Sequence, residues 1–330
     1  MKQLLNRLIN QEHISSEEAK RVLVNISQEE YNESQIASFL TVYMMRSITI
    51  EELSGFRDAL LDLCIPVDIE EYNAIDLCGT GGDGKNTFNI STLSSFVTAG
   101  AGVHVAKHGN YGVSSASGSS NVMEAMGIKF SNEIDFLKSS LDKAGICVLH
   151  APLFHPAMKN VAPIRRALGV KTFFNMLGPM VNPAFPKNQM VGVFNLELLR
   201  LYGYLYQGTE KNYSIVHALD GYDEISLTGP TKVVSNLSES LFEPKDLGLK
   251  TVRPETIFGG NTVNDAAKIF KTIIDGQGTE SQNNVVFANA GLAIATARQI
   301  PHSEGFELAK ESLLSGKAKK SLNTLIELSK

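Results

Sequence analysis

The segment Asp76-Leu-Cys-Gly-Thr-Gly-Gly-Asp-Gly-Lys-Asn-Thr-Phe-Asn-Ile-Ser-Thr92 decides the fold of this 330-residue chain. It joins a short apolar run, residues 74–78, to a glycine-rich loop that is followed by Asn89, Ser91 and Thr92. Glycine lets a ligand approach the backbone closely. The free N–H groups of such a loop and of a helix start bind anions. The segment therefore predicts a buried strand, a phosphate-binding loop and the first turn of a helix.

Two common phosphate loops do not fit this segment. The glycines have the G-x-G-x-x-G spacing of the dinucleotide fingerprint, but that motif needs an acidic residue about 20 positions further on, at the end of the second strand. Here the predicted second strand, residues 103–106, ends in Lys107. The nucleoside triphosphate loop is excluded because Lys85 is followed by Asn86, where that motif has Ser or Thr. The loop therefore serves another phosphorylated ligand.

The composition is typical of a soluble globular protein. Hydrophobic residues make up 43% of the chain and charged residues 20%, and no apolar run reaches the length of a membrane span. The N-terminus is too polar for a secretory signal, and the three cysteines show no paired spacing, so we expect a cytoplasmic protein with reduced thiols. The net charge of −5 argues against nucleic acid as a partner.

Residues 1–66 are expected to form a small helical domain. Three pairs with capping-box spacing each precede apolar residues at helical spacing. These pairs are Ser15 with Glu18, Asn32 with Gln35, and Thr49 with Glu52.

Residues 70–330 are expected to form an α/β domain with a mostly parallel central sheet, because apolar runs alternate with helical patterns. The further predicted strands are 103–106, 146–149, 190–194 and 214–219. The helical patterns are 92–100, 119–126, 132–144, 156–168 and 196–206, with further helices in 262–329. Ligands of such sheets bind at the carboxyl ends of the strands. The polar residues 79–84, 107–110 and 220–224 fall there.

Three further segments carry the side chains that a phosphorylated substrate requires. Lys107 offers a point charge to phosphate, and the serines of residues 114–120 predict a second phosphate clamp. Arg165 can hold a carboxylate through two parallel hydrogen bonds, and Asp223 with Glu224 can hold Mg²⁺. A surface salt bridge for the arginine and a solvated turn for the acidic pair are the simpler alternatives. Together the segments predict a Mg²⁺-dependent enzyme acting on a pyrophosphate-bearing sugar and a second substrate.

Six segments, in this order and spacing, resemble the anthranilate phosphoribosyltransferase family. They are Gly79-Thr-Gly-Gly-Asp83, Asn89-Ile-Ser-Thr92, Lys107-His-Gly-Asn110, His155-Pro-Ala-Met-Lys-Asn-Val161, Phe174-Asn-Met-Leu-Gly-Pro179 and Asp223-Glu224. The resemblance implies a nucleoside phosphorylase-like phosphoribosyltransferase fold. In that fold a central helical segment, about residues 165–180, packs on the N-terminal helical domain, through which two copies form a homodimer. It also implies transfer of the phosphoribosyl group from phosphoribosyl pyrophosphate to anthranilate, with release of pyrophosphate, in tryptophan biosynthesis.

The resemblance also implies the site residues. Those for phosphoribosyl pyrophosphate are Gly79, Gly82, Asp83, Thr87, Asn89, Ser91, Thr92, Lys107 and Ser119. Those for two Mg²⁺ ions are Ser91, Asp223 and Glu224, and those for anthranilate are Gly79, His108, Asn110 and Arg165. Lys107, Asp223 and Glu224 are the implied catalytic residues. Two positions depart from the family pattern, because Tyr111 stands where Arg is usual and Asn121 where Asp is usual.

Two alternatives share the fold. A pyrimidine nucleoside phosphorylase would show a Lys-x-Ser-Gly-Arg segment where this chain has Lys107-His-Gly-Asn110. A non-catalytic nucleic-acid-binding relative would show a basic face and degraded metal ligands, whereas this chain is acidic and keeps Asp223 and Glu224.

Overall fold

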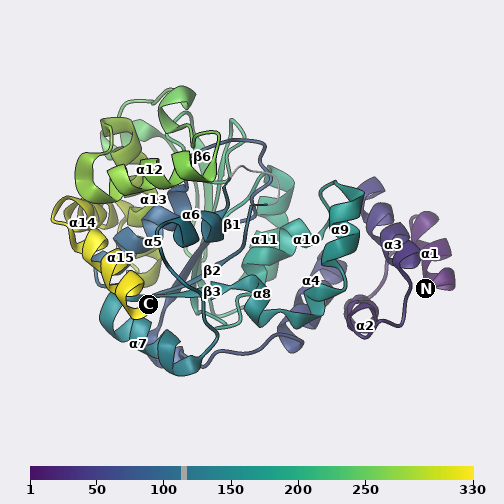
Figure 1. Ribbon diagram of the computed structural model, residues 1–330. Helices are drawn as coiled ribbons and strands as arrows, with labels where there is room; N and C mark the ends of the chain where they lie inside the picture. Colours follow the sequence, from purple (N-terminus) through teal and green to yellow (C-terminus); the bar gives the residue numbers. More distant parts are fainter. Residues whose placement is uncertain (113–116) are drawn as a thin grey trace. The chain divides into compact units, whose positions relative to one another are not determined.

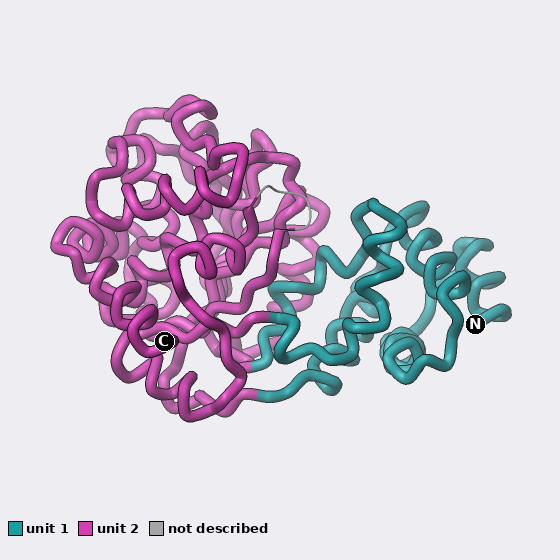
Figure 2. The backbone as a smooth tube through the Cα atoms, viewed as in Figure 1, with its two compact units in different colours: residues 1–66, 151–183 teal, residues 67–150, 184–330 magenta. Residues whose placement is uncertain are grey.

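The computed structural model describes residues 1–112 and 117–330, so Ser114 and Ser115 of the predicted phosphate clamp lie outside the described residues. The chain forms two compact units (Figure 2). The smaller unit contains residues 1–66 and 151–183, and the larger unit contains residues 67–150 and 184–330. Each unit is therefore built from two separate stretches of the chain.

The smaller unit is helical. Its first stretch forms α1 (Lys2–Ile9), α2 (Ser16–Ser27), α3 (Glu33–Met45) and α4 (Ile50–Asp62). Its second stretch forms α8 (Ala151–Phe154), the 3₁₀ helix η2 (Pro156–Lys159), α9 (Ala162–Leu168), α10 (Phe174–Leu177) and the 3₁₀ helix η3 (Gly178–Met180). Phe173 joins the two stretches, since its ring stacks on Phe56 at 4.4 Å between centroids and meets Phe39 edge-on.

The capping pairs begin the helices as the sequence predicts. Reciprocal capping boxes start α3 at Asn32 and α4 at Thr49, and the Ser15 hydroxyl accepts the Glu18 N–H at the start of α2. The predicted helix 156–168 is wrong, because η2 and α9 are separate. Pro163 has no N–H for a bond to the carbonyl four residues earlier, so a helix that begins at Pro156 cannot continue through it.

The larger unit contains one seven-stranded sheet of order β3-β2-β1-β4-β5-β6-β7. Its strands are β1 (Ile75–Gly79), β2 (Val105–Gly109), β3 (Ile146–His150), β4 (Asn188–Gly192), β5 (Asn212–Ala218), β6 (Thr231–Ser235) and β7 (Glu239–Phe242). The first five pair in parallel, and Ile75 of β1 is in register with both Val105 and Asn188. The antiparallel strands β6 and β7, which the sequence analysis did not predict, extend the sheet beyond β5.

Helices cover the sheet on both faces (Figure 1). The α-helices of this unit are α5 (Ile90–Gly100), α6 (Ser119–Ala125), α7 (Ile134–Ala144), α11 (Leu196–Gln207), α12 (Val263–Thr272), α13 (Glu280–Arg298), α14 (His302–Leu314) and α15 (Lys317–Leu328). Shorter turns are the 3₁₀ helices η1 (Glu70–Tyr72), η4 (Pro244–Leu247) and η5 (Pro254–Ile257) and the π-helix η6 (Ile273–Gln277). Neighbouring β4 residues point to opposite faces. Gln189 bonds Tyr206 of α11, whereas Met190 joins the core on the other face.

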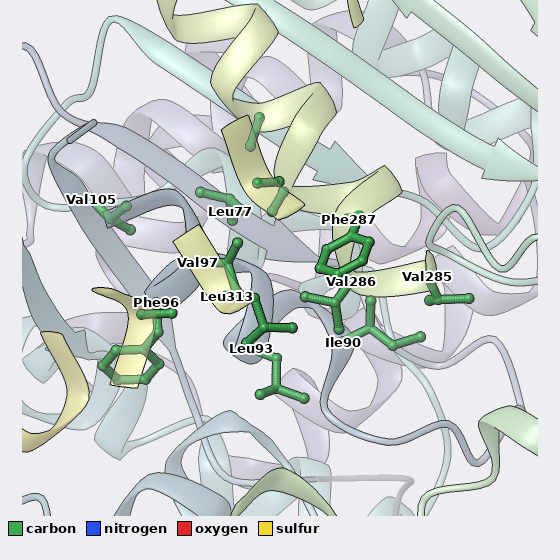
Figure 3. Packing of buried hydrophobic residues seen from close by; sticks show 14 of the residues in the cluster. Leu77, Ile90, Leu93, Phe96, Val97, Val105, Val285, Val286, Phe287 and Leu313 are labelled. Atoms are coloured by element: carbon green, nitrogen blue, oxygen red, sulfur yellow. The ribbon is translucent and has the colours of Figure 1, made fainter. Parts of the chain in front are cut away.

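Helix α13 lies at the centre of that core. Its residues 285–296 are all buried, and it packs on α5, α14 and the strands β4 and β5. Figure 3 shows side chains of α5, α13 and α14 that belong to the same buried cluster as Leu77 of β1 and Val105 of β2. The loop after β1 and the first turn of α5 are therefore anchored on a fully packed interior.

Strand β1 lies between β2 and β4, where the direction of strand order reverses. Loops that leave a parallel sheet at such a switch point diverge and open a ligand site at the carboxyl ends of the strands. β2 begins and ends later than the predicted 103–106, so Lys107 and His108 belong to the strand and do not follow it. None of the helices in residues 1–112 and 117–330 combines the length and the apolar character that crossing a bilayer requires.

Candidate active site

The glycine loop after β1 takes a conformation that only glycine adopts at low cost. Gly81, Gly82 and Gly84 have φ of +62°, +76° and +74°, in the left-handed region. The Gly81 N–H donates to Oδ2 of Asp223 at 2.8 Å. The predicted loop therefore forms, and it presents a backbone donor to a carboxylate from a distant segment.

The first turn of α5 also faces this acidic pair. The Ser91 N–H donates to Oε1 of Glu224 at 3.1 Å. An anion at a helix N-terminus is stabilised by the orphan N–H groups and by the helix dipole. The Thr92 hydroxyl is buried, with no hydrogen-bond partner among the described residues. The turn thus offers the donors that a phosphate would use.

Asp223 and Glu224 lie in the irregular segment between β5 and β6, within the larger unit. The Asp83 carboxylate is hydrogen-bonded to the backbone and side chain of Asp223. Burial raises the pKa of all three carboxyl groups, and the charge of Asp83 adds to the rise at Asp223. Oε2 of Glu224 is buried without a hydrogen-bond partner among the described residues. The structure therefore brings three predicted site residues together as an acidic cluster, in which Asp223 is buried and Asp83 and Glu224 are half-buried.

Lys107 supplies a buried positive charge to this cluster. Its side chain is 1% exposed, and its ammonium donates to the carbonyl of Leu77 at 2.7 Å. Burial lowers the pKa of Lys107, while the charges of Asp76 and Glu224 oppose that shift. An ammonium group has three donors. The bond to Leu77 thus leaves Lys107 donors for a further oxygen ligand.

The donor set fits Mg²⁺. Mg²⁺ in phosphate-binding sites is held by one or two carboxylates together with substrate phosphates. The described residues contain no group of three or more His, Cys, Asp or Glu side chains arranged around one metal position. The acidic pair nevertheless supplies an unpartnered carboxylate oxygen on Glu224 and more negative charge than Lys107 balances. A cation that also binds phosphate would give this oxygen a partner and would balance the excess negative charge.

The second predicted phosphate segment follows β2. The Ser119 hydroxyl donates to the carbonyl of Asn110 at 3.3 Å, and the Asn110 side chain accepts the Tyr111 N–H at 2.8 Å. The amide of Asn89 donates to the Ser117 carbonyl at 3.1 Å, which joins this segment to the start of α5. His108 is buried, and its N–H donates to Oδ1 of Asp76.

The two departures from the family pattern have structural roles. Oδ1 of Asn121 accepts the N–H groups of Gly112 and Gly118, at 2.9 and 3.0 Å, on either side of residues 113–116. An aspartate could accept the same two bonds, so Asn121 preserves the acceptor. The Tyr111 hydroxyl donates to Glu124 at 2.7 Å, and its ring meets His150 edge-on.

Thr87 and Gly82 complete the loop that leads to α5. Thr87 forms an isolated antiparallel bridge with Phe258, and its carbonyl packs directly against Gly259.

Arg165 belongs to the smaller unit, where its guanidinium donates to Oδ1 of Asn175 and lies over the Phe174 ring. The predicted role of Arg165 in binding anthranilate stays a prediction.

Two residues that support the acidic pair escaped the sequence analysis. A Cβ on Gly192, at the end of β4, would lie 1.5 Å from the Asp223 carbonyl oxygen. The Asn289 side chain, buried in α13, holds the backbone of Ile225 through Ile225 N–H to Oδ1 at 3.0 Å and Nδ2 to the Ile225 carbonyl at 2.9 Å. A single amide within the run of small apolar residues 288–297 was the available signal for Asn289.

Comparisons with known proteins agree with this geometry. The α/β-domain model of a glycosyl transferase family matches residues 71–319, and the helical bundle model of that family matches residues 2–64. The anthranilate phosphoribosyltransferase of Flavobacterium psychrophilum is 69% identical over 329 residues, all of both chains. This chain belongs to the anthranilate phosphoribosyltransferase family. Its fold class is that of the family, a helical N-terminal domain with a larger α/β domain.

Solved structures of the family have the same fold. The anthranilate phosphoribosyltransferase of Thermus thermophilus superimposes with a TM-score of 0.91, at 32% identity, with 98% of each chain covered. The enzyme of Saccharomyces cerevisiae, solved with phosphoribosyl pyrophosphate and Mg, superimposes with a TM-score of 0.90 at 26% identity. That comparison covers 98% of this chain and 96% of the yeast chain.

Proposed function

We propose that this chain transfers the phosphoribosyl group from phosphoribosyl pyrophosphate to anthranilate, which gives phosphoribosyl-anthranilate and pyrophosphate. Membership of the family supports the reaction, and one observation supports its location. Asp223 and Glu224 reach the glycine loop and the first turn of α5 through 2.8 and 3.1 Å bonds to backbone N–H groups. Backbone N–H groups that can donate to phosphate, carboxylates that can bind a cation, and a buried lysine therefore lie at one end of the sheet.

The reaction is a displacement at the anomeric carbon of the ribose. The anthranilate amine forms the new C–N bond while the C–O bond to pyrophosphate breaks, and the nitrogen then releases a proton to solvent. An aryl amine is uncharged at neutral pH, so no residue has to deprotonate it before attack. Catalysis then depends on positioning and on stabilising the charge that develops on the leaving group.

The residues divide the work between the two substrates. The glycine loop with Gly79, Gly82 and Asp83 and the turn with Asn89 to Thr92 hold the pyrophosphate and ribose, together with Thr87 and Ser119. Lys107 compensates negative charge on the departing pyrophosphate. His108 and Asn110 line the anthranilate side with Gly79, and Arg165 binds the anthranilate carboxylate.

The acidic pair holds Mg²⁺, and we expect two ions per site with Ser91 as a further ligand. Bound Mg²⁺ would neutralise charge on the pyrophosphate oxygens. The excess of carboxylates over Lys107 and the unpartnered Oε2 of Glu224 support this assignment. The yeast enzyme of the family binds Mg together with phosphoribosyl pyrophosphate.

The cellular setting follows from the same assignment. The chain is a transferase of tryptophan biosynthesis, acts in the cytoplasm, and forms a homodimer through residues 1–66. Exposed apolar side chains at the ends of α1 and α3 support a contact there, since Ile9 is 61% and Met45 79% exposed. Light scattering of the purified chain tests this prediction, and a mass of one chain would contradict it.

The fluorescence of anthranilate tests the reaction directly. The protein is mixed with anthranilate and phosphoribosyl pyrophosphate, with and without Mg²⁺. We expect a fall in fluorescence that requires both substrates and Mg²⁺. A folded protein that leaves the signal unchanged would refute the proposed function. Phosphate-dependent cleavage of thymidine and a gel shift of DNA test the two alternatives.

A further inference from the structure

The metal pair lies in a segment without regular structure. β5 ends at Ala218 and β6 begins at Thr231, so neither strand fixes the backbone of residues 223–225. Carboxylates that bind a metal with two substrates must nevertheless be held within a fraction of an ångström. Some part of the surrounding unit therefore has to fix this backbone.

Asn289 of α13 meets this requirement. It is 2% exposed, and one side-chain amide makes three hydrogen bonds. Oδ1 accepts the Ile225 N–H at 3.0 Å, and Nδ2 donates to the carbonyls of Ile225 at 2.9 Å and Val285 at 2.8 Å. Both backbone groups of Ile225 are thus satisfied by one side chain, as a neighbouring strand would satisfy them.

The contact is rigid on both sides. Ile225 is fully buried in the core of the larger unit, and α13 is buried along residues 285–296. The amide of Asn289 can take only one orientation, because a flipped amide would place its NH₂ group against the Ile225 N–H. The residue just before Ile225 is Glu224, whose carboxylate reaches Ser91.

We infer that Asn289 is a positioning residue for the metal ligands Asp223 and Glu224. It acts through the Ile225 backbone and fixes the direction from which both carboxylates meet the glycine loop. This inference rests on the proposed function, because it concerns the cation held by that acidic pair. Groups that orient metal ligands commonly change metal affinity or activity by about 10- to 100-fold when they are removed.

Asn289→Asp is the decisive variant. It keeps the size of the side chain and an acceptor for the Ile225 N–H, and it replaces the amide donor with an oxygen that faces two carbonyls. Thr296→Val is the matched control. Thr296 is buried on the same helix and bonds Ser214, away from the acidic pair. Both variants lose a buried hydrogen bond of α13, but only Asn289→Asp changes a side chain that contacts residues 223–225.

Two readouts separate positioning from general destabilisation. The first is the Mg²⁺ concentration at half-maximal rate with saturating phosphoribosyl pyrophosphate. The second is the rise in melting temperature caused by Mg²⁺ with phosphoribosyl pyrophosphate. For Asn289→Asp we expect the half-saturating Mg²⁺ concentration to rise by about 10- to 100-fold, with a smaller melting shift. Thr296→Val should keep the parent values in both measurements. If Asn289→Asp keeps the half-saturating Mg²⁺ concentration and the melting shift of the parent protein, the inference is overturned.

Hydrogen exchange keeps the inference testable if Asn289 variants do not fold. In the parent protein without Mg²⁺, the Ile225 amide should exchange as slowly as the amides in the middle of α13. Exchange as fast as that of exposed loops, with protection only after Mg²⁺ is added, would overturn it. The parent protein also separates the two claims. A parent without Mg²⁺-dependent turnover refutes the proposed function, whereas a reactive parent with an unaffected Asn289→Asp variant refutes only this inference.

Discussion

A Cβ atom at Gly192 would lie 1.5 Å from the carbonyl oxygen of Asp223, so the end of β4 and the Asp223 backbone are in direct contact. The same strand end accepts the Thr80 N–H through the Gly192 carbonyl at 2.9 Å. Gly192 therefore joins the glycine loop to the acidic segment. No other residue type allows this approach without moving one of the two.

Gly192→Ala should displace Asp223 and weaken Mg²⁺-dependent turnover more than it weakens the fold. We expect the required Mg²⁺ concentration to rise and the free energy of unfolding to fall by about 1–3 kcal/mol, the range for overpacked sites. Titration of the rate with Mg²⁺ and urea unfolding measure the two effects. Gly203→Ala in α11 is the control, since its Cβ would meet only Val234 at 3.8 Å. Equal Mg²⁺ titrations for the two variants would contradict the prediction.

Asp223→Asn combined with Glu224→Gln should remove the response to Mg²⁺ without unfolding the chain. Each amide can still accept the N–H of Gly81 or Ser91, while the buried negative charge is lost. Burial raises the pKa of both acids, which means that their charged forms destabilise the ion-free protein at neutral pH. The melting temperature in EDTA should therefore rise or stay equal, and turnover should be lost.

The exposed Glu255 provides the matched control for this pair. Glu255→Gln removes one negative charge from the same unit and should leave Mg²⁺-dependent turnover intact. Normal turnover of the double variant at limiting Mg²⁺ would refute the metal assignment.

Arg165→Ala should raise the KM for anthranilate by about tenfold or more, because a hydrogen bond to a charged group contributes about 1.5–3 kcal/mol. The KM for phosphoribosyl pyrophosphate should change little. Steady-state kinetics with each substrate varied in turn provide the measurement. The neighbouring Arg166 is exposed, and Arg166→Ala serves as the control. If Arg165→Ala changed only the KM for phosphoribosyl pyrophosphate, this would contradict the proposal that Arg165 binds the anthranilate carboxylate.

The smaller unit depends on a buried ion pair. Glu52 is fully buried, and its Oε1 accepts hydrogen bonds from the Arg46 guanidinium, the Tyr43 hydroxyl and the Ile14 N–H. Arg46→Met would leave a buried carboxylate without its counter-charge, which costs about 3–5 kcal/mol. Urea unfolding of the chain should show this loss. The exposed ion pair between Lys138 and Glu71 is the control, and Lys138→Met should change the urea concentration at the unfolding midpoint little. Equal midpoints for the two variants would contradict the prediction.

His155 should contribute to acid sensitivity. Burial lowers its pKa to about 4 against an ordinary 6.5. Between these values the unfolded chain binds a proton that the folded chain does not, so stability falls as the pH falls. The contribution to the slope approaches about 1.4 kcal/mol per pH unit. His155→Gln should flatten the stability curve from pH 6.5 to 4, as followed by urea unfolding. An unchanged slope would show that other groups carry the effect.

Local sequence was sufficient for much of the fold. The capping residues Ser15, Asn32 and Thr49 begin the helices as predicted, because a cap depends on a side chain and an N–H only three residues apart. The alternation of apolar runs and helical patterns also predicted the parallel strands. It failed at Pro163, and it missed β6 and β7, which are stabilised by pairing with β5 and with each other.

The sequence by itself predicted the candidate site of this protein: the glycine loop, Lys107, and Asp223 with Glu224 were singled out by residue type and spacing. Only the tertiary structure decided how these segments are held together. Gly192 and the side chain of Asn289 contact backbone atoms of the acidic segment, from positions 31 residues before Asp223 and 64 residues after Ile225. Contacts of this kind leave no local pattern, because they arise only when strand order and helix packing bring distant segments together.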